Sequence, residues 1–248
     1  MPATALPPSG DPSGGTGRTP GTPGTPGATG ATKTCDASGM VEIHRMFRAG
    51  FGEGRALVTG VTEADAAHAE VVGDHLDMLS VGLHAHHEGE DMMLWNPLET
   101  RAPSCAVHVE RMKAQHAEML VHLNELDAAL PAWRASGQAT DAAGVLAALD
   151  GINAALAEHL PDEETNIVPV METVITQKEV DALSDHGRKA TPKGHTFQQL
   201  GAILAAQPDG GATWQRTHLP APVRLIWRVV GKPKYEANRA ALTGSRQA

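Results

Sequence analysis

Two stretches of the sequence repeat the same arrangement of residues that could bind a metal. In the first, His86 is followed four residues later by Glu90, then by a second acid, a short apolar run and a proline. In the second, His159 and Glu163 stand in the same arrangement, again ahead of an acid and a proline. Residues four apart on an α-helix lie about 40° apart around its axis and about 6 Å apart along it. Each stretch can therefore present an imidazole nitrogen and a carboxylate oxygen to neighbouring points in space.

Two further histidines interrupt the apolar faces of other predicted helices. His44 shares a helical stripe with Phe47, and His116 shares one with Met112 and Met119. A lone histidine in such a position is more often a hydrogen-bonded core residue than a ligand. Four helices that each carry an inward histidine, two of them with a glutamate at the same offset, are much harder to obtain by accident. The candidate metal ligands are His44, His86, Glu90, His116, His159 and Glu163.

The candidate ligands are nitrogen and oxygen donors, without a thiolate. Such a set suits iron, with manganese or zinc possible. Two carboxylates alone would be very costly to bury in the core of a helical bundle, and paired cations, which carboxylates can bridge, remove that cost. The acids one residue further on, Asp91 and Glu164, could orient the histidines, or replace the glutamates if the helices are slightly rotated. His84 and His87 are expected to point to other sides of the helix, and His87 could enter the site only in a different register.

Four helices of bundle length must position these side chains. Ala and Leu dominate the composition and aromatic residues make up only 3%, which favours helix over sheet. Short connections between long helices place neighbours antiparallel. We therefore predict an all-α, up-down four-helix bundle over residues 39–172. Its helices are expected from about Met40 to Gly60, Thr62 to Pro97, Ser104 to Gly137 and Thr140 to Pro169.

The two ends of the chain differ from the bundle in composition. Residues 1–38 are rich in Pro, Gly, Thr and Ser, and we predict a disordered tail there. Residues 173–248 are predicted to form a basic helical extension that packs on the bundle or trails from it. Between residues 187 and 248 there are ten Lys or Arg side chains and two acidic ones. The stretch from Arg224 to Lys232 is basic and aromatic, so it either packs on the acidic bundle or contacts an anionic membrane or another protein.

Composition also excludes several classes of function. The net charge of −9 argues against a nucleic-acid partner. No stretch approaches the ~18 apolar residues of a membrane span. The first residues lack a basic segment followed by an apolar one, so no secretory signal is expected. The two cysteines, Cys35 and Cys105, are not expected to form a disulfide, and we predict a cytoplasmic protein.

The order of these residues resembles the hemerythrin-like (HHE cation-binding) domain. That order is a histidine, a His-x-x-x-Glu motif with its second acid and proline, another histidine, and a second His-x-x-x-Glu motif, over about residues 40–171. The resemblance implies a bundle that holds two non-haem iron ions joined by an oxo or hydroxo bridge, with the six candidates as ligands. It implies that Glu90 and Glu163 bridge the two ions. Members of this family bind dioxygen, sense oxygen or iron, or act on peroxide or nitric oxide.

One feature departs from the oxygen-carrying members of that family. These have two third-helix histidines four residues apart, whereas Met112 and Leu120 stand four residues either side of His116. A missing ligand leaves an open coordination position, which favours chemistry or sensing over simple oxygen carriage. A ferritin-like di-iron site is the nearest competing bundle, but it needs glutamates on the first and third helices, where this chain has histidines.

Three functions follow as hypotheses. The first is a di-iron protein that binds or senses dioxygen or a related small oxidant. The second is an enzyme that decomposes hydrogen peroxide or reduces nitric oxide at the same centre, which the incomplete third-helix ligand set favours. The third is a metal-free structural module, which requires every inward histidine to be an ordinary core residue.

Overall fold

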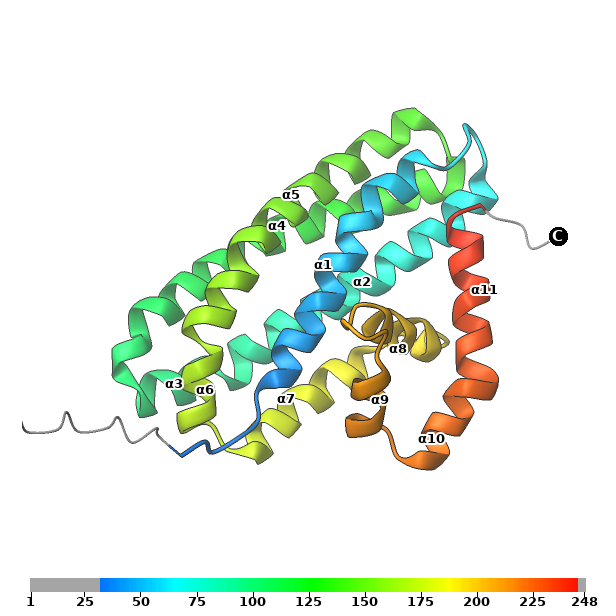
Figure 1. Cartoon of the computed structure of the whole chain (residues 1–248). Coiled ribbons are helices and arrows are strands. Elements are labelled where there is room, and N and C mark those ends of the chain that lie inside the picture. Colours follow the sequence, from blue (N-terminus) through cyan, green and yellow to red (C-terminus); the bar gives the residue numbers. More distant parts are fainter. Residues whose placement is uncertain (1–31, 245–248) are drawn as a thin grey trace, which may run out of the picture. The chain divides into compact units, whose positions relative to one another are not determined.

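The computed structural model describes residues 32–244, and the predicted disordered tail lies outside this range up to residue 31. Within the described part of the chain every regular element is helical and no strand occurs, which confirms the all-α prediction. Four long helices form the bundle: α1 (Ser38–Thr59), α2 (Ala66–Met93), α4 (Ala106–Ser136) and α5 (Ala139–Asn166). Helix α1 packs on α2, α2 on α4, α4 on α5 and α5 on α1, which closes an up-down ring (Figure 1).

The up-down topology brings the sequence motifs to one end of the bundle. His44 lies near the start of α1 and His116 lies in the first third of α4. The pairs with His86 and His159 lie near the ends of α2 and α5. Because the chain direction alternates, the starts of α1 and α4 meet the ends of α2 and α5. Segments more than 100 residues apart in the sequence therefore share one level of the bundle.

Prolines interrupt α2 and α5 just beyond the metal motifs. Helix α2 was expected to reach Pro97, but it ends at Met93, and a short helix begins after one residue. A proline ring excludes the carbonyl of the residue four positions earlier, which for Pro97 is Met93. Pro169 stands three residues after Asn166, the last residue of α5. The short helices after these breaks are α3 (Trp95–Arg101) and α6 (Val168–Val174).

Two apolar clusters enclose the level of the motifs. The larger cluster fills most of the bundle and includes Phe47, Leu83, Met119, Leu156 and Trp133. The smaller cluster closes the end of the bundle and includes Met40, Trp95, Met112, Ile167 and Met171. The motif residues lie between these clusters, so water has little access to them.

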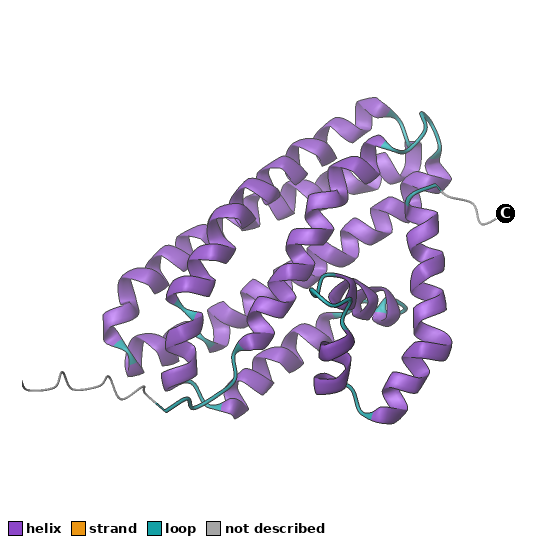
Figure 2. Cartoon of the chain, in the orientation of Figure 1, coloured by secondary structure: helices purple, strands orange, loops and turns teal. Residues whose placement is uncertain are grey.

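The C-terminal residues form a second helical layer on the bundle (Figure 2). Helix α7 packs along α2, α8 packs along α1, and α11 packs against α8 and α2. The extension therefore packs on the bundle rather than trailing from it. Within residues 32–244 no helix is both long and apolar enough to cross a membrane. The elements of the layer are α7 (Gln177–Ala190), α8 (Thr196–Ala205), α9 (Ala212–His218), α10 (Ala221–Ile226), the π-helix η2 (Trp227–Gly231) and α11 (Lys232–Leu242).

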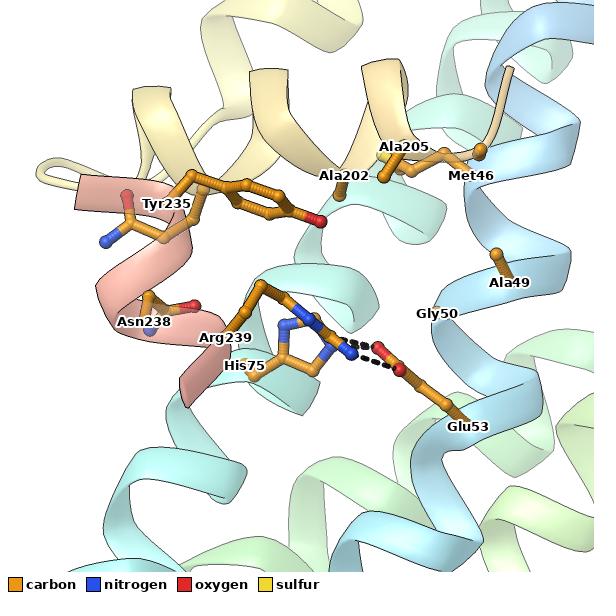
Figure 3. Close-up of a pocket in the computed structure, with 12 residues that line it drawn as sticks. Met46, Ala49, Gly50, Glu53, His75, Ala202, Ala205, Tyr235, Asn238 and Arg239 are labelled. Atoms are coloured by element: carbon orange, nitrogen blue, oxygen red, sulfur yellow. Dashed lines mark hydrogen bonds and ion pairs between the residues drawn. The ribbon is translucent and has the colours of Figure 1, made fainter. Parts of the chain in front are cut away.

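A cavity of about 220 Å³ lies where α8 and α11 meet α1 and α2 (Figure 3). Beside it, the guanidinium of Arg239 on α11 donates to both carboxylate oxygens of Glu53 on α1. His75 Nε2 on α2 lies 3.4 Å from the same carboxylate. Burial alone would raise the pKa of Glu53, but the hydrogen bonds from His75 and Arg239 lower it to about 2. This ion pair fastens the last helix to the first.

The residues just before α1 contact α6 and the first residue of α7. The backbone amide of Thr34 donates to the carbonyl of Glu172 at 2.8 Å, and that of Asp36 donates to Oε1 of Gln177 at 2.9 Å. Cys35 is a buried free thiol. The C-terminal part of the predicted tail, from residue 33 on, is thus attached to α6 and α7.

Candidate metal centre

The structure brings all six predicted ligands together, and it adds a seventh residue, His87. Their side chains form two groups, and within each group the possible ligand atoms all lie within 4.8 Å of one another. The α1-side group consists of His44, His86, Glu90 and Glu163. The α4-side group consists of His87, Glu90, His116 and His159. Glu90 belongs to both groups, so the two candidate sites are adjacent.

His87 lies inside the cluster, contrary to the prediction that it points to another side of the helix. Its ring stacks on that of His116, with 4.1 Å between the centroids. Consecutive residues of a helix point about 100° apart. His86 therefore faces the ring of His44 on α1, 5.1 Å away, while His87 faces α4. Two adjacent histidines four and three residues before Glu90 were the pattern in the sequence that could have indicated this.

The two oxygens of Glu90 face different groups. Oε1 lies 3.3 Å from Nε2 of His86, and Oε2 lies 3.4 Å from Nε2 of His116. The side chain is completely buried. Its carboxylate thus lies between one histidine of each candidate site, which is the position that a bridging ligand needs.

Glu163 occupies the corresponding position on the opposite side. Its Oε2 lies 3.3 Å from Nε2 of His44 in one group and 3.6 Å from Nε2 of His159 in the other. This side chain is also completely buried. Glu90 is therefore shared by the two groups, whereas Glu163 belongs to the α1-side group and approaches the other group at His159.

The inward atoms of the cluster lack the partners that a buried polar atom requires. Within the described residues, neither oxygen of Glu90 or Glu163 has a hydrogen-bond partner, and the same holds for Nε2 of His87, His116 and His159. Each buried polar atom without a partner costs about 1–3 kcal/mol. Cations between these atoms would satisfy all of them, so the cluster fits metal far better than an ordinary core.

The outward nitrogens of His44, His116 and His159 are held by side chains around the cluster. Nδ1 of His44 donates to Oε1 of Glu164 at 2.9 Å, and Nδ1 of His159 donates to Oε1 of Gln115 at 3.1 Å. Glu164 also accepts a hydrogen bond from Arg48 at 2.8 Å. A proton fixed on Nδ1 leaves a lone pair on Nε2, which faces the cluster. The sequence predicted that Glu164 orients a histidine or replaces a glutamate as ligand. In the structure Glu164 lies in the orienting position.

Comparison with known protein families gives one match. The model of the Hemerythrin HHE cation binding domain matches residues 36–171, more than half of the chain. The chain belongs to this family. Searches of curated proteins and of solved structures find no match. The matched residues contain the whole cluster, so the HHE domain and the bundle coincide, and the C-terminal layer lies beyond it.

The HHE domain of this chain has five imidazoles and two carboxylates in its cluster. The sequence lacks the second third-helix histidine of oxygen-carrying members, and the structure shows what replaces it. Leu120 is 47% exposed and faces away, while Met112 belongs to an apolar cluster. The fifth imidazole comes from α2, as His87 beside His116. Seven nitrogen and oxygen donors without sulfur suit iron, manganese or zinc.

Burial and the contacts within the cluster of the HHE domain shift the pKa values of its side chains in different directions. Burial, and then the neighbouring Glu163, raise the pKa of Glu90 well above its usual range. Burial opposes ionisation of Glu163, but the nearby His44, at 3.3 Å, and the charges of the surrounding histidines lower its pKa. Burial lowers the pKa of His86 and His87 well below the usual value, and lowers that of His159 to about 4. Neutral imidazole is the form that binds metal, so these three are ready to do so near neutral pH.

Proposed function

We propose that the HHE domain holds two non-haem iron ions and binds or senses dioxygen or a related small oxidant. The observation that carries this proposal is the position of Glu90 and Glu163. Each lies between histidines of the two groups, and none of their four oxygens has a hydrogen-bond partner among the described residues. Seven nitrogen and oxygen donors favour iron among the common metals, although manganese and zinc fit the same donors.

The two candidate sites differ in the number of imidazoles. The α1-side group has two, and the α4-side group has three. With Glu90 and Glu163 both bridging, a cation on the α1 side would have four protein ligands and one on the α4 side five, which leaves more room for an added ligand on the α1 side. Both histidines of that group are buried, which restricts such a ligand to a small molecule such as dioxygen, peroxide or nitric oxide. Two iron ions would supply electron transfer to or from that molecule.

Side chains of this chain prepare the site for such a ligand. Glu164 and Arg48 keep the Nδ1 proton of His44 in place, so Nε2 stays directed at the α1-side group. Phe47 lies against His86, with 5.5 Å between ring centroids, and excludes water on that side. These contacts hold the imidazoles before a metal arrives, which lowers the cost of ordering them.

An enzyme was inferred from the missing third-helix histidine. The α4-side group contains a further imidazole, that of His87 stacked on His116, which weakens that inference. Decomposition of peroxide or reduction of nitric oxide thus becomes the second candidate. A cytoplasmic location stays part of the proposal, because Cys35 and Cys105 are free thiols.

Metal analysis and optical spectroscopy of the full-length protein test the proposal. The protein is loaded with ferrous iron without oxygen, desalted, and compared with samples loaded with manganese or zinc. We expect two iron ions per chain and an absorption change when oxygen is added, and reversal on removing oxygen would indicate binding. Oxygen release on adding peroxide, or consumption of nitric oxide, would support the enzyme instead. Retention of less than one iron per chain would contradict the proposal.

A further inference from the structure

The outer side of α10 and η2 exposes an unusual number of large aliphatic side chains. Among residues 32–244, nine large hydrophobic side chains are exposed, and five of them lie in this one segment. Leu225 and Val229 are 61% and 64% exposed. We call this surface the α10–η2 face. It consists of Val223, Leu225, Ile226, Val229 and Val230.

Between Ala221 and Gly231 only Trp227 and Gly231 are buried, so the aliphatic side chains of this segment face solvent. Trp227 and Gly231 point inward, where a Cβ atom at Gly231 would lie only 2.7 Å from the ring of Phe197 on α8. At about 100° per residue, Leu225 and Val229 fall on the side opposite Trp227. A helix on the surface of a globular protein normally turns its apolar side to the core. Here the aliphatic side chains stay exposed, because no other element of the described residues packs on them.

The stretch of sequence that contains this face is basic and has no acidic residue. Between residues 210 and 235 there is no Asp or Glu, although the whole chain has a net charge of −9. Lys232 has an acidic partner, Glu236, at 3.6 Å, and the other four basic side chains have none among the described residues. Arg228 is exposed beside Val229. The basic residues of the stretch are Arg216, Arg224, Arg228, Lys232 and Lys234.

We propose that the α10–η2 face binds the surface of a bilayer rich in anionic lipids. Such a surface offers both parts of the match, namely an apolar layer for the aliphatic side chains and lipid phosphates for the cations. The eleven residues of α10 and η2 are about 16 Å long, which suits a helix lying in the plane of the membrane. Long basic side chains beside an apolar face reach the headgroups while their stems stay in the apolar layer.

A second copy of the chain is a poorer partner for the same face. Two such faces in a symmetric dimer would bring five basic side chains of one copy against five of the other. Like charges in contact disfavour an interface by several kcal/mol. Charge complementarity therefore selects the anionic membrane, and self-association becomes a result that the test can detect.

Flotation of the full-length protein with lipid vesicles tests the proposal. One set of vesicles contains phosphatidylcholine alone, and the other contains an equal mixture of phosphatidylcholine and phosphatidylglycerol. We expect the protein to float with the mixed vesicles, less so as salt is added, and to stay unbound with phosphatidylcholine alone. Failure to float with the mixed vesicles at low salt would overturn the proposal, and so would equal binding to both sets.

Paired variants separate the two parts of the face. Arg224→Gln and Arg228→Gln should each reduce binding about fivefold, the effect of about 1 kcal/mol per cation. Leu225→Ser should reduce it about tenfold or more, because a buried leucine contributes about 1.5–3 kcal/mol. Leu225 and Arg228 are exposed, and Arg224 donates at 2.6 Å to the carbonyl of Leu219 just before α10, so circular dichroism and iron content should stay unchanged.

Matched controls come from exposed residues elsewhere on the molecule. Val107→Ser on α4 removes an aliphatic side chain that is 75% exposed, and Arg188→Gln on α7 removes a cation. Neither should alter flotation, and a loss as large as that of the face variants would contradict the proposal. Sedimentation without lipid is the second measurement. A dimer that Leu225→Ser dissociates would assign the face to a second copy and overturn it.

Discussion

His116 on α4 donates its Nδ1 proton to Oδ1 of Asp91 on α2, at 2.8 Å. Asp91 directly follows Glu90, whose carboxylate lies on the inner side of the same histidine. Trp95, four residues later, donates its indole proton to the same oxygen of Asp91 at 2.6 Å. On the other side of the cluster, Glu164 holds His44 in the same manner. The second acid of each motif therefore positions a histidine of the adjacent helix.

The first prediction concerns this outer acid. Asp91→Ala should weaken iron binding about 10–100-fold, because His116 loses the partner that orients it. Asp91→Asn keeps an oxygen acceptor and should have a smaller effect. Competition with a chelator measures the affinity. Asp127→Ala is the control, since Asp127 on α4 accepts hydrogen bonds from Ser80 and His84 on α2 and from neither histidine nor tryptophan of the cluster. An equal loss of affinity in the control would contradict the assigned role.

The second prediction separates His87 from its neighbour in the sequence. His87→Gln should reduce the iron content from two ions per chain toward one, because it removes an imidazole from the α4-side group. His84→Gln should keep both ions, because His84 pairs with Asp127 at 3.1 Å away from the cluster. Metal analysis after desalting measures the difference. Two ions retained by His87→Gln would show that this imidazole is not needed as a ligand.

The sequence predicted the fold and most of the cluster, because helical periodicity places residues three and four apart on one face. His44 and His116 each interrupt an apolar stripe, so their inward direction followed directly. The same reasoning missed His87, because it assumed one narrow inner face for each helix. A cluster with two adjacent groups needs a wider face, and neighbouring residues such as His86 and His87 can then both point inward.

Other features depend on contacts that no single segment contains. Trp227 is buried with its ring 6.2 Å from that of Tyr235 on α11, so the sequence of α10 and η2 alone did not show which side is exposed. The end of α2 was predicted at Pro97 but lies at Met93, because a proline ring excludes the carbonyl of the residue four positions earlier. The pattern predicted the elements, and packing decided where they end and which side they bury.

The third prediction concerns the cost of keeping the cluster. Burial and Glu163 raise the pKa of Glu90, so the metal-free protein buries a carboxyl group without a partner. Glu90→Leu should abolish iron binding and stabilise the metal-free protein by about 1–3 kcal/mol, measured by denaturant unfolding. A chelator should lower the melting temperature of the iron-loaded wild type but not of this variant. Glu88→Leu is the control, because Glu88 is exposed on the same helix. A less stable Glu90→Leu protein would argue against an unsatisfied carboxyl group.

The fourth prediction concerns the ion pair that fastens α11 to α1. The pKa of Glu53 falls from its usual 4.5 to about 2 in the folded protein, so the folded state favours the ionised carboxylate (Figure 3). Its contribution to stability is complete above about pH 4.5 and disappears as the pH falls toward about 2. Glu53→Gln should lower the free energy of unfolding by about 1 kcal/mol near neutral pH, a value that allows for partial exposure to solvent.

The difference between Glu53→Gln and the wild type should then shrink steadily below pH 4.5, because protonated Glu53 resembles glutamine. Urea unfolding at a series of pH values measures it. Arg239→Gln should show the same trend, since it removes the cation of the same pair. Asp150→Asn is the control, because Asp150 pairs with Arg55 on the surface with 59% of its side chain exposed, and such a pair contributes little. A difference that stayed constant down to pH 3 would mean that the charge of Glu53 does not hold α11 in place.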